Sequence, residues 1–362
     1  MEEKNYDQGY VAFNNGLITS IGDMQDITAD RDDFDAGGGY VLPGFVDAHT
    51  CIGLKEESLR HEGVDWNESS APITPQMNAL DGFNPRDGAI VNALNGGVTT
   101  AVAIQGNMNL IGGQGIAIKL HGHIPAEMVI KMPCAIKFSL GEEPKTAYGG
   151  RGRSPVTRLA AAAMIREALM KARTYWEKGS SAIDYASEAL APLFKGEIPA
   201  YFHADRGDDI ITALGICKEF GFDCVIVHGA ESPTAAEQIK GANAKVIAGP
   251  LVLTNYSYET RNAGVQIPME LYEKSVSFCI TTDHHASPIE YLSVSAALAV
   301  REGLPEDIAL KSVTIEPARI AGIAHRVGSL AVGKDADILV FSQHPFYYAS
   351  QIKVFANGEQ IR

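Results

Sequence analysis

Apolar and polar positions follow two rhythms in the central part of the chain. Short apolar runs lie at residues 40–46, 98–104, 116–120, 135–140, 200–202, 224–227, 245–248 and 277–281. Between them, apolar residues recur every three to four positions, as helices require, at residues 86–95, 157–177, 182–194, 208–220, 234–241, 288–302 and 305–323. This alternation predicts right-handed βαβ units and a parallel sheet. About eight strand candidates favour a closed (β/α)8 barrel over the alternative, an open doubly wound sheet.

The two ends of the chain carry a different pattern, with short β-rich runs and tight turns. Residues 10–22 predict a hairpin around Asn14-Asn15-Gly16, and residues 354–361 contain another Asn-Gly turn. We expect the two ends to pair into one small β-domain. The predicted domains are therefore residues 1–42 with 327–362, and an α/β barrel over residues 43–326.

Composition narrows the range of partners. The chain has 30 basic and 44 acidic residues, a formal net charge of −14, which disfavours nucleic acid and anionic membrane surfaces as partners. No apolar run reaches the roughly 18–20 residues that cross a bilayer, and the first ten residues lack the apolar core of a secretion signal. Five widely spaced cysteines indicate reduced thiols rather than a disulfide framework. We expect a cytoplasmic protein that acts on a small molecule.

Candidate chemistry concentrates where strand-like runs end. His49, His203, His228 and Asp283 each lie at or just beyond the end of such a run, and Cys51 lies two residues beyond His49. In a parallel barrel these positions gather at the C-terminal mouth. Imidazole, thiolate and carboxylate are all ligands of zinc. The sequence therefore predicts a metal site, although a single histidine after a strand is more often a hydrogen-bonded structural residue.

These residues also carry a resemblance to a known family. Pro43-Gly-Phe-Val-Asp-Ala-His49-Thr-Cys51 resembles the first-strand signature of the amidohydrolase superfamily, which is normally Pro-Gly-x-(Val/Ile)-Asp-x-His-x-His. The later histidines and Asp283 follow in the order of that family, and residues 317–322 and 327–337 resemble its C-terminal helix and returning strand. Within the superfamily the chain looks closest to the imidazolonepropionase-like and prolidase-like branch.

The resemblance implies a TIM-like barrel with a small β-sandwich built from both termini. It also implies a metal-dependent hydrolase of C–N bonds, with one or two divalent ions, zinc being most suitable, and Asp283 as general base and then general acid. His49, Cys51, His203 and His228 would be ligands. Relatives commonly assemble, so a homo-oligomer is allowed. A deaminase remains a minor alternative.

Two departures from the family pattern keep alternatives open. Cys51 replaces the second histidine of the first strand, and it is either a thiolate ligand or a neutral filler in a decayed site. If the site has decayed, the protein is a scaffold or binding protein of the same fold. Family members also usually have one more strand before the first hairpin, so the start is expected to be either truncated or wrongly assigned, which would leave a sheet edge unpaired.

A bridging ligand between two metals is expected near the fourth strand. Glu142 follows that strand and a glycine, which favours it as the carboxylate facing the mouth. The alternative is Lys137, carboxylated as in related hydrolases. One of His284 and His285, directly after Asp283, is a further candidate to orient substrate.

Overall fold

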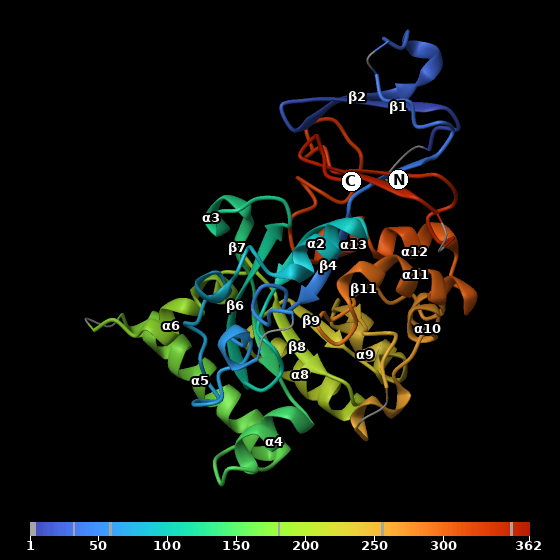
Figure 1. Cartoon of the computed structure of the whole chain (residues 1–362). Helices are drawn as coiled ribbons and strands as arrows, with labels where there is room; N and C mark the ends of the chain where they lie inside the picture. Colours follow the sequence, from blue (N-terminus) through green and yellow to red (C-terminus); the bar gives the residue numbers. More distant parts are fainter. Residues whose placement is uncertain (1–4, 32, 58–59, 180–181, 255–256, 348–349) are drawn as a thin grey trace.

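An eight-stranded sheet forms the centre of the molecule in the computed structural model, which describes residues 5–31, 33–57, 60–179, 182–254, 257–347 and 350–362 (Figure 1). The strands lie in the spatial order β11-β10-β9-β8-β7-β6-β5-β4. Their bounds are β4 Phe45–Thr50, β5 Val98–Ala103, β6 Ile111–Lys119, β7 Val129–Ser139, β8 Ala200–Ala204, β9 Cys224–His228, β10 Lys245–Ala248 and β11 Phe278–Ile280. The predicted α/β class and TIM-like barrel are confirmed.

Side chains at the end of β4 and just after β11 join the first and last strands of the barrel. The buried Asp47 carboxylate accepts hydrogen bonds from the Thr282 amide at 3.0 Å and the Thr282 hydroxyl at 2.6 Å. The Cys51 amide donates to the His284 carbonyl at 2.7 Å. Because these contacts cross the gap between β4 and β11, the sheet closes on itself.

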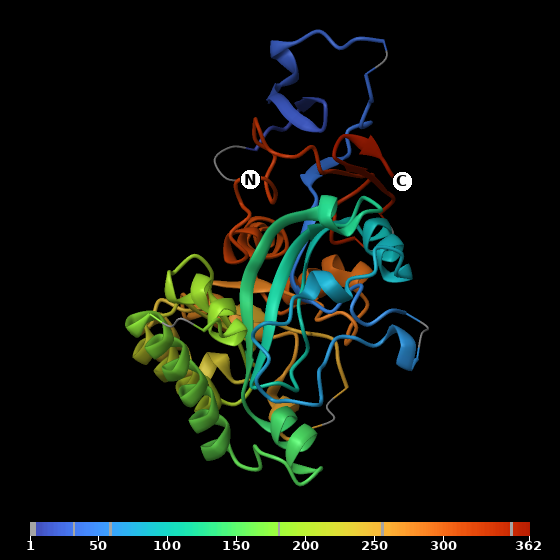
Figure 2. The same ribbon diagram turned by 90° about the vertical axis from the view of Figure 1, so that its left-hand side faces the viewer.

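One strand departs from the predicted parallel arrangement. Strand β6 is antiparallel to both β5 and β7, whereas the other neighbouring pairs from β4 to β11 are parallel. Only residues 104–110 join β5 to β6, and a parallel crossover needs a dozen or more residues. The chain therefore turns back directly, and β6 and β7 form a long, curved hairpin (Figure 2).

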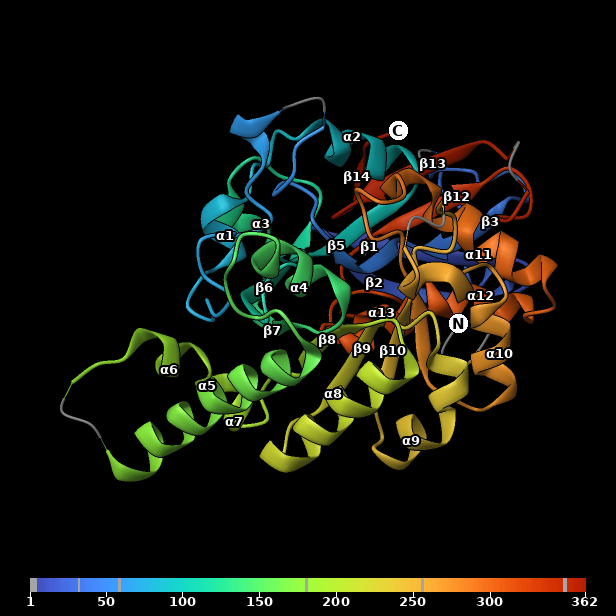
Figure 3. The same ribbon diagram turned by 90° about the horizontal axis from the view of Figure 1, so that it is seen from below.

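Helices surround the strands on the outside (Figure 3). They are α1 Ala79–Gly82, α2 Gly88–Asn95, α3 Pro125–Met128, α4 Glu142–Gly149, α5 Arg158–Lys178, α6 Tyr185–Ala189, α7 Ala191–Phe194, α8 Gly207–Phe220, α9 Ala236–Gly241, α10 Ile267–Glu273, α11 Leu292–Arg301, α12 Glu306–Ser312 and α13 Ile315–Ile320. The predicted helices over 182–194 and 305–323 are each divided into two. Among the described helices none is long and apolar enough to cross a bilayer.

Both faces of most barrel strands are buried, which explains why apolar residues predominate in them. In β8, Phe202 packs in the large cluster between sheet and helices, whereas Tyr201 packs in the cluster inside the barrel. In β9, Ile226 faces outward in the same way, and Val225 and Val227 face inward. This two-residue period fixes which side chains reach the interior.

The chain ends form two smaller sheets on one side of the barrel (Figures 1 and 2). Strands β1 Gly9–Asn14 and β2 Leu17–Asp23 form the predicted hairpin, and β3 Tyr40–Pro43, β12 Ile338–Phe341, β13 Ile352–Ala356 and β14 Glu359–Gln360 form a four-stranded antiparallel sheet. The predicted run at 40–46 is divided at Gly44, where a Cβ atom would lie 2.1 Å from Thr99 Oγ1. One extended segment therefore serves both the small sheet and the barrel.

A buried ion cluster joins the small sheet to the barrel. Lys119, at the end of β6, contacts the carboxylates of Asp335 and Asp337, with 3.3 Å between Lys119 Nζ and Asp335 Oδ2. Arg326 also pairs with Asp335 at 2.8 Å, and the Thr99 hydroxyl donates to Asp337 at 3.2 Å. All three members Lys119, Asp335 and Asp337 are buried, so each charge depends on its partners.

Candidate metal centre

The structure brings together four of the residues predicted to carry the chemistry. His49 Nδ1 lies 2.9 Å from Asp283 Oδ1, and His228 Nε2 lies 3.1 Å from Asp283 Oδ2. The imidazole rings of His203 and His228 are 4.7 Å apart between centroids. These side chains come from β4, β8, β9 and the segment after β11, all at the carboxyl ends of parallel strands, where active sites of such barrels lie.

Strand periodicity explains two of these orientations. His203 follows the inward Tyr201 by two residues, so it faces the barrel interior as well. In β7, Lys137 lies between Ile136 and Phe138, which both pack on the outer face, and its side chain is fully buried inside. Lys137 pairs with Tyr201 in the β7–β8 ladder, which sets it one step deeper than His203.

The orientations of the His228 and Asp283 side chains depend on an unusual backbone conformation. His228 has φ 69° and Asp283 has φ 50°, both in the left-handed region that non-glycine residues seldom adopt. After the inward Val227, an ordinary extended His228 would point outward; its left-handed backbone turns it to the mouth instead. Such a conformation costs on the order of 1–3 kcal/mol per residue, and it is typical of functional sites.

Lys137, His49 and Asp283 form a buried chain of polar contacts. Lys137 Nζ lies 2.6 Å from His49 Nε2, so Nδ1 of the neutral His49 ring donates to Asp283. Burial and the nearby Lys137 lower the pKa of His49 to about 3, and burial lowers the pKa of Lys137 to about 8. Burial raises the pKa of a carboxyl, but His228 and His49 outweigh it and hold the pKa of Asp283 well below its ordinary value. Asp283 is therefore a carboxylate.

Asp205 is a site residue that the sequence reasoning missed. It is buried two residues after His203, and its Oδ2 lies 3.4 Å from His203 Nε2 and 3.9 Å from His228 Nδ1. Burial raises the pKa of Asp205, but the hydrogen bond and charge of His203 and the charge of His228 leave it below the ordinary value. The spacing of His203 and Asp205 could have revealed it, because residues two positions apart lie on one face at the end of a strand.

The donor set fits a divalent metal. His203 Nδ1 is buried and has no hydrogen-bond partner in the described structure, which is costly for an imidazole nitrogen unless something binds it, and the buried His228 Nε2 faces the Asp283 carboxylate at 3.1 Å. The possible ligand atoms of His49, His228 and Asp283 lie within 4.8 Å of one another, as do those of His203, Asp205 and His228. Nitrogen and carboxylate oxygen donors suit zinc, with iron or manganese as alternatives.

Cys51 lies beside this cluster but outside both ligand groups. Its thiol donates to the His284 carbonyl at 2.9 Å and lies 3.2 Å from His285 Nδ1. Burial and the Asp283 carboxylate raise the pKa of Cys51 well above the ordinary value, so the thiol is neutral. In this geometry Cys51 ties the end of β4 to the segment after β11.

Glu142 and Lys137, the two candidates for a bridging ligand, lie in different surroundings. Gly141, with φ 89°, ends the extended segment after β7, and Glu142 is the exposed first residue of α4. Its amide donates to Glu259 at 2.8 Å. Lys137, in contrast, is in contact with His49, so Lys137 and not Glu142 joins the cluster.

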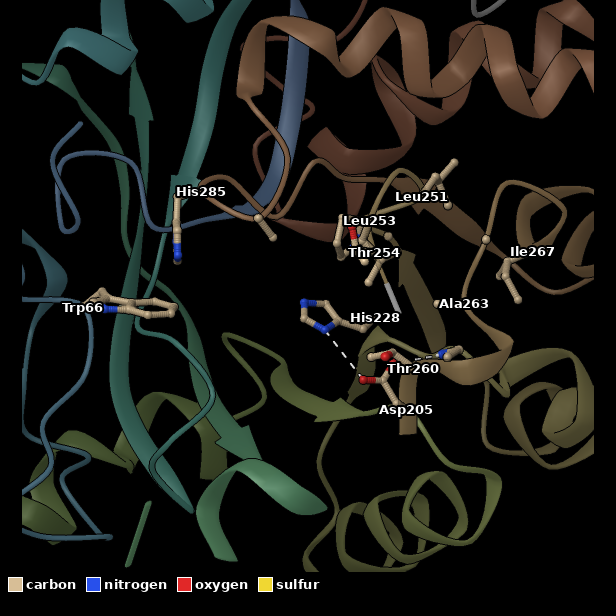
Figure 4. Close-up of a pocket in the computed structure, with 15 residues that line it drawn as sticks. Trp66, Asp205, His228, Leu251, Leu253, Thr254, Thr260, Ala263, Ile267 and His285 are labelled. Carbon is tan, nitrogen blue, oxygen red and sulfur yellow. Dashed lines mark hydrogen bonds and ion pairs between the residues drawn. The ribbon is translucent and has the colours of Figure 1, made fainter. Parts of the chain in front are cut away.

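A cavity of about 320 Å³ opens beside His228 and Asp205 (Figure 4). Trp66 and His285 lie on one side of it and Leu253 on the other, with His228 between them. The Trp66 and His285 rings are 4.5 Å apart, edge to face. Trp66 was not foreseen from the sequence; of the two histidines after Asp283, His285 is the one that lines the cavity.

The barrel and the histidine–aspartate cluster at its mouth define the class of fold, and comparison with known proteins identifies the family. The sequence pattern of the amidohydrolase family matches residues 40–361, so the chain belongs to this family. Members are hydrolases of C–N bonds that in general bind divalent metals. The predicted superfamily is thus confirmed.

Individual relatives support the same family assignment. The chain is 26% identical to amidohydrolase tasK of Hapsidospora irregularis, over 97% of this chain but only 39% of tasK, so it spans about two fifths of that protein. It is 24% identical to imidazolonepropionase of Picrophilus torridus, with 97% of this chain and 92% of that protein covered. The crystal structure of an amidohydrolase from Thermotoga maritima MSB8 superposes with a TM-score of 0.93 at 37% identity, covering 97% of this chain and 94% of that one.

Proposed function

We propose that this protein hydrolyses a C–N bond in an amide, cyclic amide or peptide-like small molecule, using one or two divalent metal ions, with zinc most suitable. The observation that carries the proposal is the buried His203 Nδ1, which has no hydrogen-bond partner in the described structure, beside the His228 imidazole and the ionised Asp283. His49, His203 and His228 would hold the metal beside the Asp283 carboxylate, with Asp205 close to two of these histidines.

A metal bound there would supply Lewis acidity, which brings the pKa of water towards 7 and polarises the scissile carbonyl. The chain supplies the proton transfers. Asp283 accepts the proton of the attacking water and passes it to the departing nitrogen, acting as general base and then general acid. His49 Nδ1 orients the Asp283 carboxylate by its 2.9 Å hydrogen bond, which leaves Nε2 as the His49 nitrogen that can face a metal.

We propose Lys137 in place of Glu142 as the bridging ligand. The Lys137 amine is fully buried and has its pKa lowered to about 8, so a substantial neutral fraction exists near neutral pH. Only the neutral amine adds to carbon dioxide, forming an N–C bond and releasing one proton. The resulting carbamate would supply two oxygens at the position of the present contact with His49.

The decisive experiment is metal analysis of protein purified without chelators. We expect one or two equivalents of a divalent metal, lost in H203A and retained in H61A, since His61 is an exposed loop histidine. The metal-loaded wild type should hydrolyse at least one substrate among N-acyl amino acids, dipeptides and cyclic ureides. Absence of metal from the wild type, with no binding after zinc addition, contradicts the proposal and favours a scaffold protein of this fold.

A further inference from the structure

The cavity beside His228 has an apolar far wall built by the segment that follows β10. Leu251 and Ile267 are buried, Leu253 is half-buried, and all three line the cavity. Gly249 allows the segment to turn sharply over Thr281: it has φ 142°, and a Cβ atom there would lie 2.2 Å from the Thr281 carbonyl oxygen. The wall is therefore held against the end of β11, close to Asp283.

The opposite wall is aromatic. The Trp66 indole faces the cavity with His285 (Figure 4). The Lys55 amine lies 4.8 Å from the centre of the Trp66 ring and is not among the residues that line the cavity.

The fixed charge on the cavity lining is negative. Asp205 is the one carboxylate among the described lining residues, and none of these residues is a lysine or arginine. Two nearby arginines are held by acidic partners, Arg206 by Asp208 at 2.7 Å and Arg261 by Glu231. An anionic substituent in this cavity would lose water, find no lysine or arginine on the lining and face Asp205, so the cavity disfavours it.

We propose that this cavity is the subsite for an uncharged apolar substituent next to the scissile bond, a branched alkyl or an aryl group. The inference rests on the proposed function, because it takes the reacting bond to lie at the His228–Asp283 cluster. The volume of about 320 Å³ lies at the low end of small-molecule sites, which limits the substituent to a compact group. The substrates favoured by this subsite place an uncharged hydrophobic group in the cavity, whatever charge they carry on the other side of the scissile bond.

The test is binding of hydroxamates, which chelate active-site metals, to the zinc-loaded protein, measured by isothermal titration calorimetry. The series is acetohydroxamate, butyrohydroxamate, hexanohydroxamate, benzohydroxamate and the monohydroxamate of succinic acid. We expect affinity to rise about fourfold per buried methylene until the cavity is full. Benzohydroxamate should bind more than tenfold more tightly than acetohydroxamate, and the succinate derivative no more tightly than acetohydroxamate.

A matched pair of variants assigns the effect to the wall. L253N should reduce the gain in affinity from acetohydroxamate to the longer hydroxamates at least threefold. V252N should not reduce this gain, because the neighbouring Val252 is 49% exposed and does not line the cavity. Three results would each overturn the subsite without contradicting the proposed hydrolase function. These are measurable but equal affinities for the whole series, the highest affinity for the succinate derivative, and equal effects of L253N and V252N. No hydroxamate binding by protein that contains zinc would instead refute the proposed function and the subsite with it.

Discussion

Replacing Lys119 by Met tests whether the buried ion cluster joins the small sheet to the barrel. In the wild type, Lys119 lies between the buried carboxylates of Asp335 and Asp337. After substitution Asp335 keeps Arg326, but Asp337 keeps only the Thr99 hydroxyl at 3.2 Å and the amide of residue 357 at 3.1 Å. One buried carboxylate is then without a cation, and breaking such a pair costs about 3–5 kcal/mol.

Urea unfolding of K119M, followed by far-UV circular dichroism, measures this cost. The control is K218M, because Lys218 is exposed on α8, and its free energy of unfolding should change by no more than about 0.5 kcal/mol. The double variant K119M/D337N should recover part of the loss, since the unpaired charge is removed. A loss in K119M below about 1 kcal/mol, or no recovery in the double variant, would refute the reasoning.

Three further predictions concern the metal centre. D283N should keep its metal but lose about 10²–10⁴-fold in turnover, as expected for loss of a general base; normal turnover would contradict the assigned role. C51A should retain its metal by elemental analysis, because the neutral thiol bonds to the His284 carbonyl; metal loss would make Cys51 a ligand. K137M should lower metal content and turnover at least tenfold, while E142Q should change both less than twofold, and the reverse ranking would restore Glu142 as the bridging ligand.

Much of the barrel could be predicted because its strands are short, apolar and bounded by amphipathic helices. The direction of β6 was also within reach, since the seven residues 104–110 leave no room for a crossover helix. The prediction instead treated every apolar run as one more βαβ unit. The division of the run at residues 40–46 depends on the close approach of Gly44 to Thr99, which only the folded chain reveals.

The sequence predicted which strand ends carry the site residues, but not the direction in which each side chain points. Lys137 lies between outward-facing Ile136 and Phe138, so strand alternation alone favoured it over Glu142, which follows a helix-initiating Gly141. His228 is different, because its inward direction comes from a left-handed backbone that no apolar pattern encodes. The same holds for the cavity wall after β10, which a loop without a recognisable motif provides.

The passage from β3 to β4 through Gly44 has a mechanical consequence. Only four residues, 45–48, separate Gly44 from His49, and all of them are extended and buried. A tilt of the terminal sheet would therefore displace the His49 imidazole, because the connecting residues are extended and cannot absorb the movement. The terminal sheet thus fixes the position of β4 along its own axis. Substitutions that disturb this sheet should therefore also shift His49.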